Sequence, residues 1–167
     1  MNAQTTLNLG DIAFTGYQSE SPEKFSFVFL KDVEIGTTIS FTDHGWQEEG
    51  DFFIYEEGII TLILTDSFEC GDEVVIILEP NFQALDIEGN VIGTITEVGE
   101  FTLSQAGDQI FAYQGSLPEQ VDQSNFIAAI HMNGEWDEDS TGSHDSAKPD
   151  VFTDGVNSLA IYPEENV

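Results

Sequence analysis

One short acidic segment carries the oxygen atoms that a calcium ion requires. It reads Asp137-Glu138-Asp139-Ser140-Thr141-Gly142, and Asp145 follows. Calcium takes about six to eight hard oxygen ligands, and carboxylates at alternate positions, a hydroxyl oxygen and a glycine bend supply several of them. The segment therefore predicts a metal site formed by Asp137, Asp139, Thr141 and Asp145.

The same spacing opens an EF-hand loop, but the rest of that motif is missing. The twelfth position of the loop is Lys148, where an EF-hand places a bidentate glutamate, and no helical pattern flanks the segment. We therefore expect a looser calcium loop, with a solvated acidic loop without bound metal as the alternative. The sequence leaves both interpretations open.

Other candidate chemistry is weaker. A second acidic cluster follows an apolar strand pattern and consists of Asp43, Glu48, Glu49 and Asp51, which favours an exposed turn. The three histidines lie too far apart to indicate a zinc site. No G-x-S-x-G elbow is present, and Ser143-His144-Asp145 are contiguous, whereas the members of a catalytic triad come from separate elements. The sequence predicts no catalytic centre and hence a protein that is not an enzyme.

Both tryptophans lie in turn or loop sequences. Trp46 follows Gly45, and Trp136 lies near Gly134. An exposed indole at such a position can stack on a sugar ring, whereas a buried one closes the end of a β-sandwich. Burial in the core is the more common outcome, and the sequence does not choose between the two.

The elements that would position these residues are short β-strands. Apolar residues alternate in Phe25–Leu30 and Thr37–Thr42. Short continuous apolar runs indicate strands buried on both faces at Phe52–Tyr55, Ile59–Leu64 and Val74–Leu78. No window of twelve residues shows a helical period, apart from a turn around Pro118–Asp122. The expected strands are Leu9–Thr15, Phe25–Leu30, Thr37–Thr42, Phe52–Tyr55, Ile59–Leu64, Val74–Leu78, Val91–Val98, Ile110–Tyr113, Phe126–Ile130 and Ser158–Ile161.

This pattern predicts an all-β fold, an antiparallel β-sandwich of about ten short strands, with a closed barrel as the rival architecture. Residues 1–167 are expected to form a single domain, excised from a longer secreted protein. The strand pattern stops from Asn133 to Thr153, which predicts a long acidic loop. Long ordered loops in compact domains are often functional.

The charge of the chain excludes several partners. There are 32 acidic residues against 3 lysines or arginines, which gives a formal net charge of -29. Binding to nucleic acid or to an anionic membrane surface requires cations that this chain lacks. No segment is long and apolar enough to predict membrane insertion. A surface of this charge repels itself, so salt and divalent cations are expected to stabilise the fold.

Several motifs resemble a module of secreted and surface proteins in Bacteroidota and cyanobacteria. They are Gly10-Asp11-Ile12-Ala13-Phe14, Phe25–Leu30, Phe41-Thr42-Asp43-His44-Gly45-Trp46, Gly107-Asp108-Gln109-Ile110-Phe111-Ala112-Tyr113-Gln114-Gly115 and Phe126–Ile130. The succession of strand, acidic turn and Gly-Trp is also distantly similar to the lamin-tail type of immunoglobulin-like sandwich. The resemblance covers about residues 7–162 and implies an extracellular or cell-surface domain of a larger chain. It supplies no active-site residues.

These observations together predict a non-catalytic extracellular or cell-surface module with a binding or structural role, which interacts with divalent cations, calcium above all, through its acidic loops. One alternative is a self-assembling subunit of a surface fibre or layer. A second is an accessory domain of a secreted hydrolase. The partners we consider are further copies of the chain, other surface proteins and carbohydrate.

Overall fold

β-Strands make up the regular structure of the residues that the computed structural model describes, which are 4–53, 57–119, 121–137, 142 and 144–161. The ten strands are β1 (Ile12–Gln18), β2 (Lys24–Phe29), β3 (Thr38–Thr42), β4 (Gly58–Leu64), β5 (Glu73–Ile77), β6 (Gln83–Asp86), β7 (Gly93–Gly99), β8 (Gln109–Tyr113), β9 (Phe126–His131) and β10 (Ser158–Ala160). No helix occurs among these residues.

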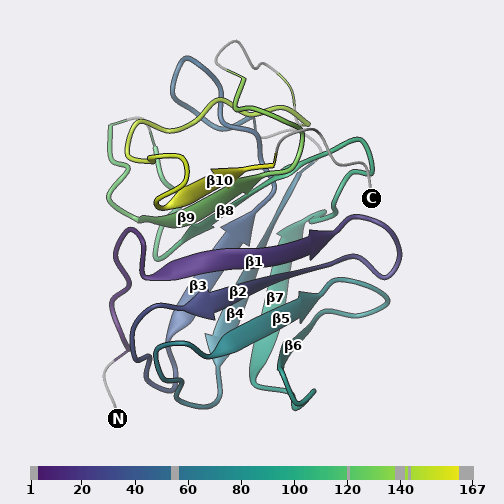
Figure 1. The fold of residues 1–167 in the computed structure, drawn as a ribbon, viewed down its shortest axis with the longest axis vertical. Helices are drawn as coiled ribbons and strands as arrows, with labels where there is room; N and C mark the ends of the chain where they lie inside the picture. Colours follow the sequence, from purple (N-terminus) through teal and green to yellow (C-terminus); the bar gives the residue numbers. More distant parts are fainter. Residues whose placement is uncertain (1–3, 54–56, 120, 138–141, 143, 162–167) are drawn as a thin grey trace.

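The strands form two sheets that face each other (Figure 1). One sheet has four strands in the order β1-β2-β5-β6, and the other has six in the order β10-β9-β8-β3-β4-β7. The predicted antiparallel β-sandwich is therefore confirmed, and among the named strand pairs the pairing of β10 with β9 is parallel. The immunoglobulin-like assignment stays a prediction.

Phenylalanine fills the space between the sheets. Phe25, Phe27 and Phe29 alternate along β2, so all three side chains point to the same face, and each is at most 1% exposed. Phe41 of the opposite sheet packs edge-on against Phe25 at 5.0 Å and tilted against Phe27 at 5.3 Å between ring centroids. Burying aromatic side chains of this size is worth several kcal/mol on the order-of-magnitude scale of apolar area.

The six-stranded sheet is also buried on its other face where β8 and β9 lie. Ile110 and Ala112 face the other sheet, whereas Phe111 and Tyr113 belong to a second apolar cluster on the outside. We call this second group the outer aromatic cluster; it consists of Trp46, Phe52, Phe111, Tyr113, Phe126, Ala129, Ala147 and Phe152. A strand buried on both faces has no room for alternating polar residues, which explains the continuous apolar runs in the sequence.

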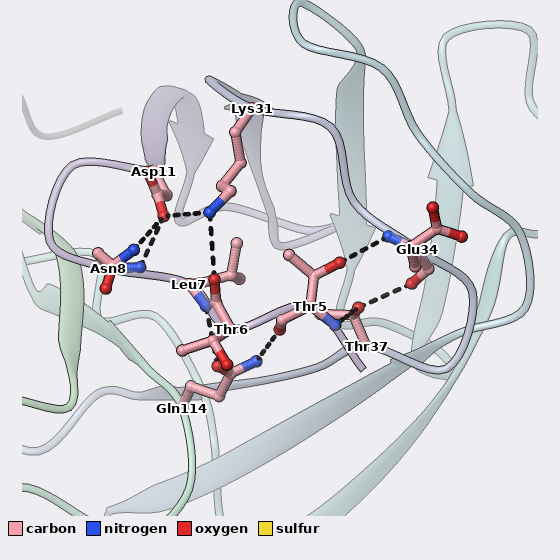
Figure 2. Close-up of polar contacts among 9 residues, drawn as sticks. All are labelled: Thr5, Thr6, Leu7, Asn8, Asp11, Lys31, Glu34, Thr37 and Gln114. Carbon is pink, nitrogen blue, oxygen red and sulfur yellow. Dashed lines mark hydrogen bonds and ion pairs between the residues drawn. The ribbon is translucent and has the colours of Figure 1, made fainter. Parts of the chain in front are cut away.

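Where β3 begins and β8 ends, hydrogen bonds and an ion pair hold the N-terminal residues in place (Figure 2). Gln114 accepts a hydrogen bond from Leu7 N at 3.0 Å, and its amide donates to Thr5 O at 3.0 Å and to Thr38 O at 2.9 Å. Lys31 forms an ion pair with Asp11 at 3.2 Å and donates to Thr6 O. One amide side chain thus closes this end of the sandwich.

Two predicted elements differ from the structure. Glu119 and Asp122 exchange both backbone hydrogen bonds across an isolated antiparallel bridge, so the chain does turn near Pro118–Asp122 as predicted, but the turn is not helical. Of the predicted strand Phe52–Tyr55, Phe52 forms only an isolated bridge with Trp46, and residues 54–56 lie outside the described part of the chain. The other predicted strands are found with bounds that move by up to three residues.

Candidate functional site

Two long loops cover the outer aromatic cluster at the same end of the sandwich (Figure 1). The first follows β3 and contains residues 43–53, and the second lies between β9 and β10 and contains the described residues 132–137, 142 and 144–157. Trp46 N donates to Ser146 Oγ at 2.8 Å, and Ala147 N donates to Trp46 O at 2.7 Å. Segments 100 residues apart are therefore joined directly.

Gly45 makes this close approach feasible. A Cβ atom at this position would lie 2.5 Å from Gly142 O and 2.7 Å from Asp145 O, well inside contact distance. Both obstacles are backbone atoms, which move only if the loop moves. The Gly45-Trp46 pair in the sequence thus marks the point where the two loops touch.

A pocket of about 550 Å³ lies between the loops. Both tryptophans of the chain line it, and so do polar residues of the two loops, with Gln123 and Ala160 from neighbouring segments. Its volume falls within the range of small-molecule sites, about 300–1,000 Å³. The full lining is Trp46, Gln47, Glu48, Gly50, Gln123, Glu135, Trp136, Ala147, Lys148, Asp150, Asp154 and Ala160.

The two indoles have different environments. Trp46 is 3% exposed and packs edge-on against Phe52 at 4.9 Å and Phe126 at 5.6 Å between ring centroids. Trp136 is half-buried and stacks on the buried imidazole of His131 at 4.9 Å with an interplanar angle of 24°. Of the two interpretations that the sequence left open, core packing therefore applies to Trp46, and Trp136 keeps accessible surface within the pocket.

Carboxylates beneath the two loops bind backbone amides and so connect neighbouring segments of the chain. Asp43 has no exposed surface, and its two oxygens accept hydrogen bonds from Gly58 N at 2.8 Å and Thr102 N at 2.9 Å. One side chain thus joins the end of β3 to the start of β4 and to the segment between β7 and β8. A buried carboxylate without such partners would cost several kcal/mol.

Asp108 and Glu23 anchor the same segment between β7 and β8. Asp108 accepts from Ser104 N and Gln109 N, each at 2.8 Å, and Glu23 accepts from Leu103 N at 2.8 Å. The Gln109 amide donates to Asp108 Oδ1 at 3.0 Å and to Asp43 O. These carboxylates bind backbone amides and do not line the pocket, so they position the chain.

Burial shifts the ionisation of these carboxyls. Desolvation raises the pKa of Asp43 from 3.8 to about 7 against the opposing effect of its backbone hydrogen bonds, and it shares a further hydrogen bond with Glu57. Two carboxyl groups can hydrogen bond only through a proton held between them. Desolvation also raises the pKa of Asp108 well above its ordinary value, with the nearby charge of Asp43 adding to the effect, and raises that of Glu23.

His131 lies under Trp136 and is fully buried. Burial lowers its pKa, while the Gly134 carbonyl and the charges of Asp145 and Asp137 oppose the shift. The ring is therefore neutral at pH 7, and because Gly134 O can only accept, Nδ1 carries the proton that it donates at 3.1 Å. The neutral imidazole of His131 thus provides a fixed surface on which the indole of Trp136 stacks.

The predicted metal residues fall partly within the described chain. Asp137 and Asp145 lie on opposite arms of the second loop, which a hydrogen bond from Asp137 N to Ser146 O at 2.9 Å brings together. Asp139 and Thr141 lie outside the described residues. Within the described ranges, no group of three or more His, Cys, Asp or Glu side chains is arranged to hold a metal ion.

The second acidic cluster of the sequence divides in the structure. Glu48, Glu49 and Asp51 are exposed, as expected for a turn, and Glu48 lines the pocket. Asp43 is fully buried, so the exposed-turn interpretation is wrong for this residue. It follows β3 directly and ends up beneath the loops, where backbone amides replace water.

Several residues of the site could not be identified from the sequence. Gln47, Gln123 and Asp154 come from three separate segments, and no local motif marks them. Asp108 carries a usable signal, because it stands between Gly107 and a strand that is apolar at every position but its first. An acidic residue at such a position has buried surroundings and must find backbone donors.

No family model, curated protein or solved structure matches this chain. In the part of the chain that the structure describes, no helix has the length and apolarity needed to cross a membrane. The site must therefore be interpreted from its own geometry.

The buried carboxyls contribute a free energy of unfolding that falls as pH rises from about 4 to 7, while the lowered pKa values of the buried His44 and His131 oppose this fall below pH 6.5. Over this window the folded state holds a proton near Asp43 that the unfolded chain, with a carboxyl pKa of 3.8, has already released. For each proton that the folded state binds and the unfolded state does not, the free energy of unfolding falls by about 1.4 kcal/mol for every unit that the pH rises. Urea unfolding at a series of pH values in 1 M NaCl, which screens the general repulsion, measures this slope.

The variant Asp43→Asn is expected to reduce the magnitude of that slope by the contribution of up to one proton, about 1.4 kcal/mol per pH unit, whatever the substitution does to the overall stability. Asp66→Asn, which removes the charge of an exposed carboxylate, is the matched control. An Asp43→Asn slope equal to that of the unmodified protein would contradict the assignment of the proton.

Proposed function

We propose that the chain is a non-catalytic binding module of an extracellular or cell-surface protein, and that its ligand binds in the pocket between the two loops. The observation that carries the proposal is that segments 100 residues apart are tied together around a pocket lined by both tryptophans of the chain. Aromatic residues with a few convergent polar groups are typical of ligand sites.

The positions of the perturbed carboxyls support a binding role over a catalytic one. Asp43 and Asp108, with raised pKa values, are the groups that would suit general acid chemistry, but both are buried and hold backbone amides. The carboxylates that line the pocket are others: Glu48, Glu135, Asp150 and Asp154. The resemblance to secreted surface modules and the strongly acidic composition support the extracellular location.

A pocket-filling substitution tests this proposal. Ala160 lines the pocket from β10, so Ala160→Phe should occupy the space that a ligand needs. Leu159, its neighbour on the alternate face of the strand, is 40% exposed, and Leu159→Phe is the matched control. We expect a thermal-shift panel of neutral saccharides, organic cations and short peptides to stabilise the unmodified protein and Leu159→Phe but not Ala160→Phe.

Two results would contradict the proposal. Stabilisation that persists in Ala160→Phe would place the ligand elsewhere on the protein. A panel in which no compound raises the melting temperature of the unmodified protein would contradict a small-ligand pocket.

Calcium binding by the second loop is a separate candidate function. The supporting observation is that Asp137 and Asp145, predicted as ligands, lie on loop arms joined by the Asp137–Ser146 hydrogen bond. Both carboxylates also act on the same imidazole, that of His131. We propose a site of the weak extracellular kind, with a dissociation constant on the order of 0.1–1 mM.

With such an affinity, 10 mM calcium should raise the free energy of unfolding by about 1.4–2.7 kcal/mol beyond sodium chloride of equal ionic strength. Asp145→Asn should remove this additional stabilisation, while Asp66→Asn should keep it. Melting temperatures that shift equally in calcium and in matched sodium chloride would reduce the effect to general screening of the acidic surface.

A further inference from the structure

The pocket contains one aromatic surface that is both accessible and fixed. Trp136 stacks on His131 on one side and lies 5.9 Å from Phe111 between ring centroids. Its Nε1 donates to Asp154 Oδ1 at 3.4 Å. Because three neighbours fix its orientation, the half-buried indole can receive a ligand without losing side-chain entropy on binding.

The polar groups around this indole can both donate and accept hydrogen bonds. Gln47 and Gln123 carry amides, which do both, and the four lining carboxylates accept. Gln123 Oε1 already accepts from Val151 N at 3.3 Å, so its NH₂ group supplies donors. Hydroxyl groups, which also donate and accept, are the ligand groups that match such a mixed lining.

Asp154 offers a defined acceptor next to the indole. Its Oδ1 atom accepts from Ala160 N at 2.9 Å and from Trp136 Nε1, and both of these donors belong to the protein. Its second oxygen, Oδ2, is therefore the one placed to accept from a ligand hydroxyl. A charge-assisted hydrogen bond of this kind is stronger than one between neutral groups.

Charged ligands fit the pocket less well. Anions would meet Glu48, Glu135, Asp150 and Asp154, while the lysine of the lining, Lys148, donates to Phe152 O at 2.8 Å. Quaternary cations prefer cages of several open aromatic faces, and the second indole, Trp46, is only 3% exposed. The carboxylates of Glu48, Glu135, Asp150 and Asp154 are all exposed, so salt screens their attraction for cations.

We infer that this pocket binds a neutral saccharide, with one sugar ring stacked on Trp136 and its hydroxyl groups bonded to Asp154 and the two glutamine amides. This inference rests on the proposed function, because it names the ligand class of the same pocket. The C–H face of a sugar ring supplies the apolar surface that packs on an indole, and its equatorial hydroxyls reach the polar groups at the edge.

Isothermal titration with a panel of neutral oligosaccharides, acidic oligosaccharides, choline and a lysine-rich peptide tests the inference. We expect at least one neutral oligosaccharide to bind, with affinity at least ten-fold weaker in Trp136→Ala and largely kept in Trp136→Phe. Leu159→Phe, at an exposed residue outside the pocket lining, should bind within about two-fold of the unmodified protein. Ten-fold corresponds to about 1.4 kcal/mol.

A second variant covers the case in which Trp136→Ala disturbs the fold over His131. Gln47 lines the pocket, and no hydrogen bond of its side chain is found among the described residues, so Gln47→Ala should fold normally and weaken saccharide binding several-fold. If Trp136→Ala and Gln47→Ala both bind the saccharide as tightly as the unmodified protein, the inference is overturned.

The outcomes separate the two proposals. Binding of choline or the lysine-rich peptide, blocked by Ala160→Phe, with no binding of neutral saccharides, would overturn the saccharide inference and leave the binding module intact. Absence of binding across the whole panel would overturn both.

Discussion

The six-stranded sheet is apolar on both faces where β8 and β9 lie, and this constraint determines how the rest of the chain is arranged. One face is covered by the second sheet, through Phe25 and Phe27 of β2, which pack on Phe41 of β3. The other face would expose Phe111 and Phe126 to water if Trp46 and Phe52 of the first loop and Ala147 and Phe152 of the second did not pack over it. Covering this surface brings the two loops into contact, and the pocket is a consequence of that contact.

The same covering explains the buried carboxylates. Loops that leave a sheet edge expose backbone amides, and where these become buried they need acceptors. The buried Asp43 and Asp108, with the half-buried Glu23, supply those acceptors for Gly58, Thr102, Ser104 and Leu103. In a chain with a net charge of -29, protonation of such groups and screening of the surface both act in favour of the folded state.

The sequence predicted the fold more completely than the site. Alternation in Phe25–Leu30 predicted a strand, because this property depends on local periodicity. Burial on both faces was predicted for Ile59–Leu64 and Val74–Leu78, but β4 and β5 alternate between buried and more exposed residues. It is β8 and β9 that are buried at every position, because the loops cover their outer face. The pocket depends on which loops meet, as when Trp46 bonds to Ser146 and Ala147, and no local pattern encodes a contact across 100 residues. The exposed-turn interpretation failed at Asp43 for the same reason: its amide partners, Gly58 and Thr102, come from distant segments.

The most direct measurement of the central claim, that the loops cover the outer face of the sheet, is the fluorescence of Trp46 in the variant Trp136→Phe. Trp46 is the sole indole in that variant and belongs to the outer aromatic cluster. The structure predicts emission at shorter wavelength than free tryptophan in water and strong protection from quenching by acrylamide. Emission at the wavelength of free tryptophan, with full access for acrylamide, would contradict it.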